Sequence, residues 1–147
     1  MSNLIISAVP VTLVELLWSQ CVPIFERVVK KAPKDLSLDG IKSRLLSGNS
    51  MLMTIAEGDK VIAVGTLETD EYETGHKVLY IPTIAGDRME DWMDRFIEIS
   101  HAIARDLNCV EIRGKGRKGW LRTLKKNSDE WYDVSSLVGI KVKQIEE

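Results

Sequence analysis

The stretch "KVLYIPTIAGDRMEDWMDRFIEISHAIARDLNCVEIRG", residues 77–114, decides the fold. Its first ten residues are apolar and rich in β-branched side chains, which is typical of a strand. From Met89 onward apolar residues recur at steps of three and four, the period of a helix buried on one face. The short run "CVEIRG" after the helix predicts another strand. A strand, a helix and a strand in this order predict a parallel crossover in an α/β protein.

The flanking sequence extends this unit on both sides. The apolar, β-branched run at residues 4–9 predicts a short strand, and the helical pattern that follows is expected to kink or break near Val22, since Pro23 lies inside it. From residue 51 the apolar residues alternate with a period of two, which predicts a β-hairpin that turns at Gly58-Asp59. The remaining predictions are a helix capped by Thr12 with Leu16 on its buried face, a helix over 37–48 capped by Ser37, hairpin strands at about 51–57 and 60–70, a short basic helix at 117–127, and one or two strands after residue 130.

Together these elements predict one domain, residues 1–147, with a three-layer α/β architecture. Its sheet is mixed, and helices are expected on both faces. The buried stripe of the long helix is expected to comprise Trp92, Phe96, Ile99 and Ile103.

Composition narrows the functional classes. Apolar residues make up 44% and charged residues 29% of the chain, and the net charge is −2, so no global field favours nucleic acid or a membrane. No apolar run approaches the ~20 residues of a membrane span, and the N-terminus lacks the basic start of a signal peptide. Cys21 and Cys109 fit no metal or redox spacing, which indicates a reducing, cytoplasmic compartment and no metal site.

The element order resembles that of the GNAT N-acetyltransferases over nearly the whole chain. A spaced pattern in the second half is similar to small GNAT-like proteins encoded by tailed phages. The resemblance implies the GNAT fold, an acetyl-CoA site between two splayed parallel strands, and a location in the host cytoplasm or virion. The pattern comprises Trp92, Ala104-Arg105, Asn108-Cys109, Ile112, Gly116-Arg117, Gly119-Trp120 and Leu124.

In that family, backbone amides of a glycine-rich turn at the start of the long helix hold the pyrophosphate of the cofactor. Helix N-termini suit this role because their amides are unpaired and the helix dipole is positive there. Here the turn keeps one glycine but carries Asp87, Glu90 and Asp91, so a capping box of Asp87 and Glu90 is favoured over a working pyrophosphate site. The cofactor candidates are Ile84, Ala85, Gly86, Asp87, Arg88 and Met89.

The acid–base residues of the family are only partly matched. GNAT enzymes use a strand glutamate or a water as base and often a late tyrosine as acid, but that tyrosine position falls on Lys125 here. Glu68, Tyr80 and Tyr132 are the catalytic candidates, each weighed against a purely structural role. His76 and His101 have no partner at metal-ligand spacing.

A basic segment, residues 113–126, carries seven cations and no acid. The whole chain has 20 basic and 22 acidic residues, so the remainder carries 13 and 22, or −9. A single basic helix is usually solvated, and the absence of any acid in these fourteen residues adds contact with a polyanion or an acidic protein as the alternative. The candidates are Arg113, Lys115, Arg117, Lys118, Arg122, Lys125 and Lys126.

Three functions remain open on the sequence. The first is a phage-type GNAT-fold accessory with a degraded acetyl-CoA site, which binds virion components or other copies of itself. The second is an acetyl-CoA-dependent N-acetyltransferase with a divergent pyrophosphate turn. The third is a nucleic-acid-binding accessory that works through the basic segment.

Overall fold

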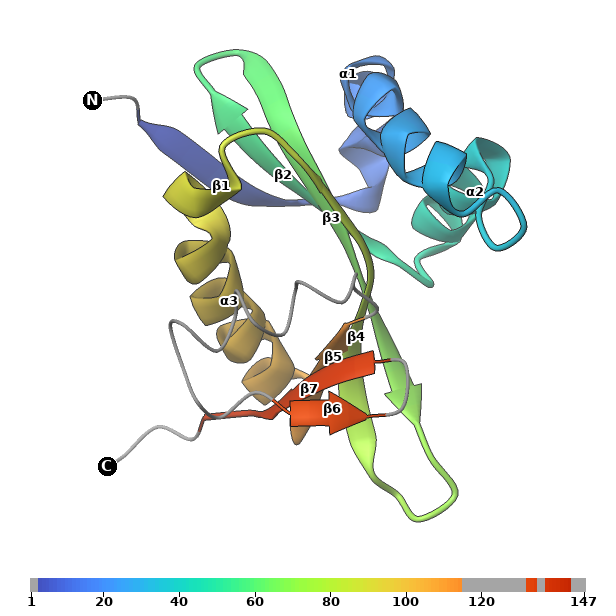
Figure 1. Ribbon diagram of the computed structural model, residues 1–147, viewed down its shortest axis with the longest axis vertical. Coiled ribbons are helices and arrows are strands. Elements are labelled where there is room, and N and C mark those ends of the chain that lie inside the picture. The colour runs from blue at the N-terminus through green and yellow to red at the C-terminus, as the bar shows by residue number, and fades with distance from the viewer. Residues whose placement is uncertain (1–2, 115–131, 135–136, 144–147) are drawn as a thin grey trace. The chain divides into compact units, whose positions relative to one another are not determined.

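The computed structural model describes residues 3–114, 132–134 and 137–143 (Figure 1). Their helices and strands confirm the predicted α/β class. No helix among them is long and apolar enough to cross a membrane. In chain order the elements are β1 (Leu4–Val9), α1 (Val11–Lys31), α2 (Leu38–Ser47), β2 (Met51–Glu57), β3 (Lys60–Glu71), β4 (Lys77–Gly86), α3 (Met89–Asp106), β5 (Glu111–Gly114), β6 (Tyr132–Val134) and β7 (Leu137–Lys141).

Hydrogen bonds connect the strands in the order β1-β2-β3-β4-β5-β7-β6. The β1–β2, β2–β3, β5–β7 and β6–β7 pairs are antiparallel, while β4 and β5 are parallel, with Val78 opposite Glu111. The sheet is therefore mixed, as predicted. The crossover through α3 is also confirmed, because α3 joins the two parallel strands.

The chain forms two compact units. Unit 1 comprises Met1–Leu67 and Thr83–Trp92, and unit 2 comprises Glu68–Pro82 and Met93–Glu147. Strands β3 and β4 and helix α3 each contribute residues to both units. The prediction of one domain over the whole chain stays a prediction.

Helix α1 corrects three predictions for unit 1. The helix runs unbroken through Pro23, so the break expected near Val22 does not occur. It begins after Pro10, whose fixed φ suits a helix start, and it has no side-chain cap, so the capping role of Thr12 is wrong. Leu16, predicted on the buried face, is 75% exposed.

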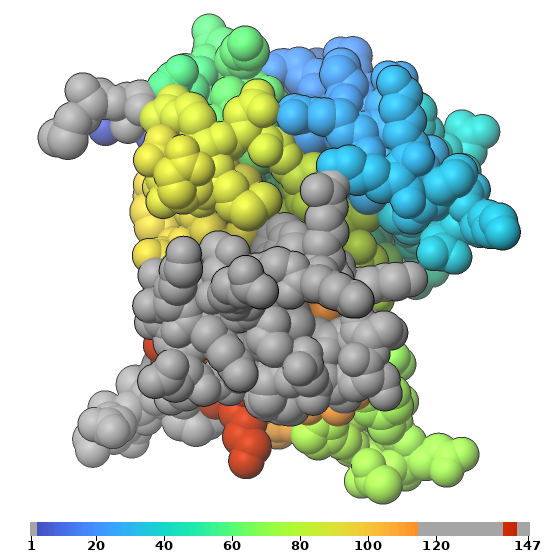
Figure 2. Space-filling model, viewed as in Figure 1, coloured from blue at the N-terminus to red at the C-terminus, as the bar shows by residue number. Residues whose placement is uncertain are grey.

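Helix α2 and the β2–β3 hairpin follow the prediction. Ser37 Oγ accepts a hydrogen bond from the Gly40 amide at 3.0 Å, and Gly48 ends the helix at φ 84°. The side chains of α1 and α2 form one continuous block in Figure 2. The core of unit 1 comprises Val9, Val14, Cys21, Ile24, Phe25, Ile41, Leu45, Leu52, Val61 and Val64.

Helix α3 buries a different stripe from the one predicted. Trp92 and Phe96 are fully buried, but Ile99 and Ile103 are only partly buried. Ser100 and Ala104 instead continue the buried face from Phe96 at steps of four residues. Ser100 Oγ donates to the Phe96 carbonyl at 2.8 Å, which lets a polar side chain occupy the buried face. The buried stripe is Trp92, Phe96, Ser100 and Ala104, with Met93 and His101 beside it.

We expect Phe96→Ala to lower the free energy of unfolding by about 3–5 kcal/mol, because it removes a fully buried aromatic ring and leaves a cavity. Ile99→Ala, on the partly buried flank of the same helix, should cost clearly less. Urea denaturation of both variants measures the two losses. Equal losses would contradict the stripe described above.

Candidate functional site

The turn between β4 and α3, which carries the predicted cofactor residues, lies in unit 1 and depends on Gly86. This glycine has φ 143°, a conformation that side chains with a Cβ rarely adopt. A Cβ built on it would lie 2.3 Å from the Ala63 Cβ and 2.6 Å from the Ile62 carbonyl oxygen. Gly86 is therefore needed because the β4 backbone lies directly against β3 at this point.

The backbone hydrogen bonds of the turn hold it in place on both sides. The Asp87 amide donates to the Ile62 carbonyl at 3.0 Å, and the indole Nε1 of the buried Trp92 donates to the Asp87 carbonyl at 2.8 Å. The Asp87 amide is thus already used within the protein. An anion at this turn would have one amide fewer than a glycine-rich cradle offers.

The acidic side chains of the turn are paired with arginines. Asp87 Oδ1 lies 3.1 Å from Arg27 Nη1, which comes from α1. Arg88 Nη1 lies 2.6 Å from Glu57 Oε2, and Arg88 Nε lies 2.9 Å from Asp91 Oδ2. These hydrogen bonds to Glu57 and Asp91 raise the pKa of Arg88 above its ordinary value. Both arginines that could bind a phosphate therefore hold carboxylates instead.

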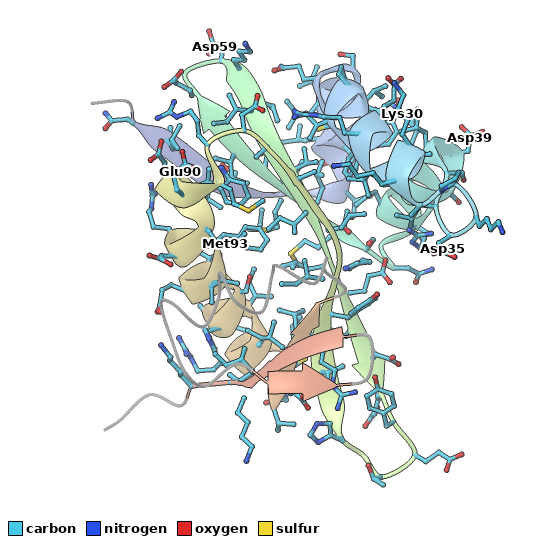
Figure 3. The ribbon with its side chains drawn as sticks, in the orientation of Figure 1. Lys30, Asp35, Asp39, Asp59, Glu90 and Met93 are labelled. Atoms are coloured by element: carbon cyan, nitrogen blue, oxygen red, sulfur yellow. The ribbon has the colours of Figure 1, made fainter. Side chains whose placement is uncertain are left out.

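The capping box predicted for Asp87 and Glu90 is wrong. Helix α3 begins at Met89, so Asp87 precedes the residue that could cap it, and its carboxylate pairs with Arg27. Arg88 lies between them at φ 59°, and its carbonyl accepts a hydrogen bond from the Asp91 amide at 2.9 Å. Glu90, in the first helical turn, is exposed (Figure 3) and interacts favourably with the positive end of the helix dipole.

The remaining cofactor candidates are Ile84, Ala85 and Met89, and all three are partly buried. Ala85 packs against the core of unit 1. To bind a pyrophosphate here, Arg27 and Arg88 would have to exchange their carboxylate partners. The space beside Gly86 is filled by β3, and carboxylates occupy the nearby cations.

We expect Gly86→Ala to lower the free energy of unfolding by roughly 2–4 kcal/mol, because the new methyl group overlaps β3 and the backbone is strained. Gly75→Ala is the matched control. Gly75 also has a positive φ, 83°, but has open space around it, so only about 1–2 kcal/mol of conformational strain is expected. Denaturant melts compare the two, and similar losses would show that Gly86 does not lie tightly against β3.

The acid–base candidates Glu68 and Tyr80 lie in unit 2. Burial raises the pKa of Tyr80, and the Glu68 carboxylate and the Tyr72 phenol raise it further. The structure thus brings Glu68 and Tyr80 within electrostatic range of one another. The side chain of Tyr132 lies outside the described residues, and its backbone pairs with Gly139.

A polar cluster in unit 2 was missed by the sequence analysis. Glu111 is almost completely buried, and its carboxylate binds three nitrogen atoms. His76 Nε2 lies 2.5 Å from Glu111 Oε2, and Arg113 Nε and Nη2 donate to Oε1 and Oε2 at 3.0 and 3.2 Å. Arg113 Nη1 also donates to the Tyr72 hydroxyl at 3.0 Å. The only sign of this cluster in the sequence was the alternation of polar and apolar residues in "EIR", residues 111–113. The same alternation occurs in any strand with one exposed face, so it did not reveal the cluster.

This cluster changes the view of two predicted residues. His76, which has no metal-ligand spacing in the sequence, pairs with a carboxylate 35 residues further along the chain. The guanidinium of Arg113 binds Glu111 and Tyr72, so it would have to give up these contacts to bind a phosphate. The other six cations predicted to bind a polyanion lie outside the described residues. No metal-binding group of His, Cys, Asp and Glu occurs within the described part of the chain.

Neither cysteine is placed as a nucleophile. Both are buried, and burial raises the pKa of Cys21 to about 11. Burial also raises the pKa of Cys109, although the nearby Lys77 lowers it in part. Both thiols are therefore protonated at neutral pH.

Comparison with solved structures identifies the fold. A ribosomal-protein-alanine N-acetyltransferase from Brucella melitensis biovar Abortus 2308 is 11% identical, with a TM-score of 0.68 over 91% of this chain and 96% of that one. A GNAT family acetyltransferase from Staphylococcus aureus is 16% identical, with a TM-score of 0.59 over 81% and 90%. The chain has the GNAT fold.

A third GNAT-fold structure, a predicted acetyltransferase from Clostridium acetobutylicum, was solved with acetyl-CoA. It is 14% identical, with a TM-score of 0.62 over 90% of this chain and 96% of that chain. At such identities the likeness concerns the fold alone. No protein-family model matches the sequence, and no curated protein does.

Proposed function

We propose that this chain is a GNAT-fold accessory protein whose acetyl-CoA turn is closed by its own side chains, so that binding to a partner replaces efficient catalysis. The observation that carries the proposal is the pairing of Arg27 with Asp87 and of Arg88 with Glu57. Arg27 and Arg88, which could bind a pyrophosphate, are already paired with carboxylates. The GNAT fold keeps acetyl-CoA plausible as a weak ligand.

The charges around the turn support this proposal. Four carboxylates, those of Glu57, Asp87, Glu90 and Asp91, accompany the two arginines, and the ion-paired members are all partly exposed. A pyrophosphate would have to displace carboxylates from both arginines. It would then leave those carboxylates beside its own negative charge, which further weakens binding.

We expect acetyl-CoA to bind with a dissociation constant weaker than about 100 µM. Glu57→Gln frees Arg88 from one partner and should tighten binding roughly two- to fivefold. Asp59→Asn is the control, since Asp59 lies exposed in the neighbouring β2–β3 turn (Figure 3). Isothermal titration calorimetry measures all three proteins.

A low-micromolar constant for the unaltered protein, near −8 kcal/mol, would overturn the proposed closure of the turn. An equal gain from Glu57→Gln and Asp59→Asn would instead show a general field effect, with no specific restraint by Glu57. These two outcomes distinguish a turn closed by specific ion pairs from a surface that repels anions in general.

The proposed partner is an acidic protein surface that contacts the basic segment, residues 113–126. The excess of cations there, on a chain otherwise at −9, supports a local contact with an acidic surface over wrapping along a duplex. A virion component or a second copy of the chain would suit such a role. A mobility shift with random duplex DNA at low salt, lost in an Arg117→Glu, Arg122→Glu and Lys126→Glu variant, would favour nucleic acid instead.

The second candidate is an N-acetyltransferase, supported by the proximity of Glu68 and Tyr80. Glu68 would take a proton from an amine and Tyr80 would donate one, so Glu68→Gln and Tyr80→Phe should each lower acetyl transfer by about 10²-fold. Glu71→Gln, at the exposed end of the same strand, should leave it unchanged. Release of free thiol from acetyl-CoA with a panel of amines measures the rates. No release with any amine would remove this candidate.

A further inference from the structure

Helix α3 binds all three polar groups of one residue beyond β7, Lys143. The Lys143 amide donates to His101 Nδ1 at 3.2 Å, and Arg105 Nη1 donates to the Lys143 carbonyl at 2.8 Å. The Lys143 ammonium lies 3.5 Å from Glu98 Oε1. Glu98, His101 and Arg105 stand at positions i, i+3 and i+7 of the helix and so share one face. These three side chains, called the Lys143 clamp below, hold the chain where it leaves β7 beside α3 (Figure 1).

His101 is the member of the clamp whose hydrogen-bonding role depends on its protonation state. A backbone amide can only donate, so the ring nitrogen that it contacts must carry a lone pair. In the clamp, the neutral imidazole therefore carries its proton on the other nitrogen, Nε2. A protonated ring carries an N–H on both nitrogens. It would present a donor to the Lys143 amide, and the hydrogen bond would be lost.

Burial and the charges around His101 oppose its protonation within the clamp. Only 1% of His101 is exposed, so an added charge would be kept from water. Arg105 and the Lys143 ammonium are cationic, and Glu98 is the one carboxylate of the clamp. Movement of Lys143 away from α3 would remove a cation and admit water to the ring. The charged residues on the described parts of β4, β5 and β7 in unit 2 are Lys77, Glu111, Arg113 and Lys141.

We propose that the Lys143 clamp is a pH-sensitive device, which holds the chain beyond β7 against α3 while His101 is neutral and releases it when His101 binds a proton. The direction follows from linkage, because acid favours the state that binds more protons, and the released state is the one that accommodates a charged ring. Release also loosens Val142, which is buried and whose amide donates to the Val110 carbonyl at 2.9 Å. The clamp lies in unit 2 and involves neither acetyl-CoA nor the β4–α3 turn.

The test is ¹⁵N NMR of the 147-residue chain between about pH 8 and pH 5, the range in which histidines titrate. At the upper end, the His101 ring should be the Nε2–H tautomer. As His101 protonates, the Lys143 amide should lose protection from hydrogen exchange, relative to a free amide at the same pH. The loss should reach up to about tenfold per pH unit, the limit for one linked proton. The Cys109 amide, which donates to the Ala104 carbonyl at 2.8 Å, should keep its protection.

Variants assign the pH dependence to His101. In His101→Asn, the side-chain oxygen can accept from the Lys143 amide but does not titrate, so protection should persist without its pH dependence. His76→Gln alters the other histidine of the chain, and Glu98→Gln removes the carboxylate of the clamp. Both controls should keep the pH dependence of the Lys143 amide.

An Nδ1–H tautomer at neutral pH overturns the proposal, and so does Lys143 protection that is the same at every pH. Equal losses at Lys143 and Cys109 would mean global unfolding, which also overturns a local release. A pH dependence that persists in His101→Asn, or disappears in either control, assigns the effect to another group. If His101→Asn leaves Lys143 unprotected throughout, the unaltered protein decides, since different midpoints for the His101 ring and the Lys143 amide reject the coupling.

Discussion

The close approach of β4 to β3 at Gly86 is the constraint on which unit 1 depends. It leaves no room for a side chain on Gly86 and brings the Asp87 amide onto the Ile62 carbonyl. The chain then turns through Arg88 into α3, where the indole of Trp92 reaches back to the Asp87 carbonyl. The glycine that a sequence reader would assign to phosphate binding is thus required by strand packing, whatever ligand the turn holds.

The two polar regions of the protein show opposite uses of charge. Around the β4–α3 turn, carboxylates and arginines pair at a partly exposed surface, where solvent screens each contact and partners can exchange. The Glu111 carboxylate is buried away from water, which could otherwise replace its partners. The ion pairs around the turn are therefore weak individually, whereas the contacts of the buried Glu111 keep one geometry.

Most of the secondary structure could be predicted from the sequence because the hydrophobic period changes clearly along it. The crossover at 77–114, the hairpin turn at Gly58 and the cap at Ser37 each follow from local chemistry. Pro23 was misjudged because a missing amide costs a long helix only one hydrogen bond, and packing in the core of unit 1 can offset that loss. The α3 stripe was misjudged because Ser100 bonds to its own helix and so occupies an apolar position.

The candidate site was less predictable, since its contacts join residues far apart in sequence. Arg27 and Asp87 are 60 positions apart, and His76 and Glu111 are 35 apart. The acids of the β4–α3 turn, read from the sequence alone, are expected to repel an anion. Their arginine partners become known only from the structure, because some of these partners come from other elements. The same reason hid the Glu111 cluster, whose members are unremarkable singly and acquire meaning only through β4–β5 pairing.

The burial of both native thiols also makes the protein convenient for spectroscopy. Cys21 and Cys109 lie inside the fold and are protonated at neutral pH, so maleimide reagents should ignore them. A cysteine introduced at an exposed turn position, such as Asp59 or Thr74, would be the only reactive thiol on the native protein. Fluorophores or spin labels could then be attached at chosen places without first removing the cysteines that fill the core.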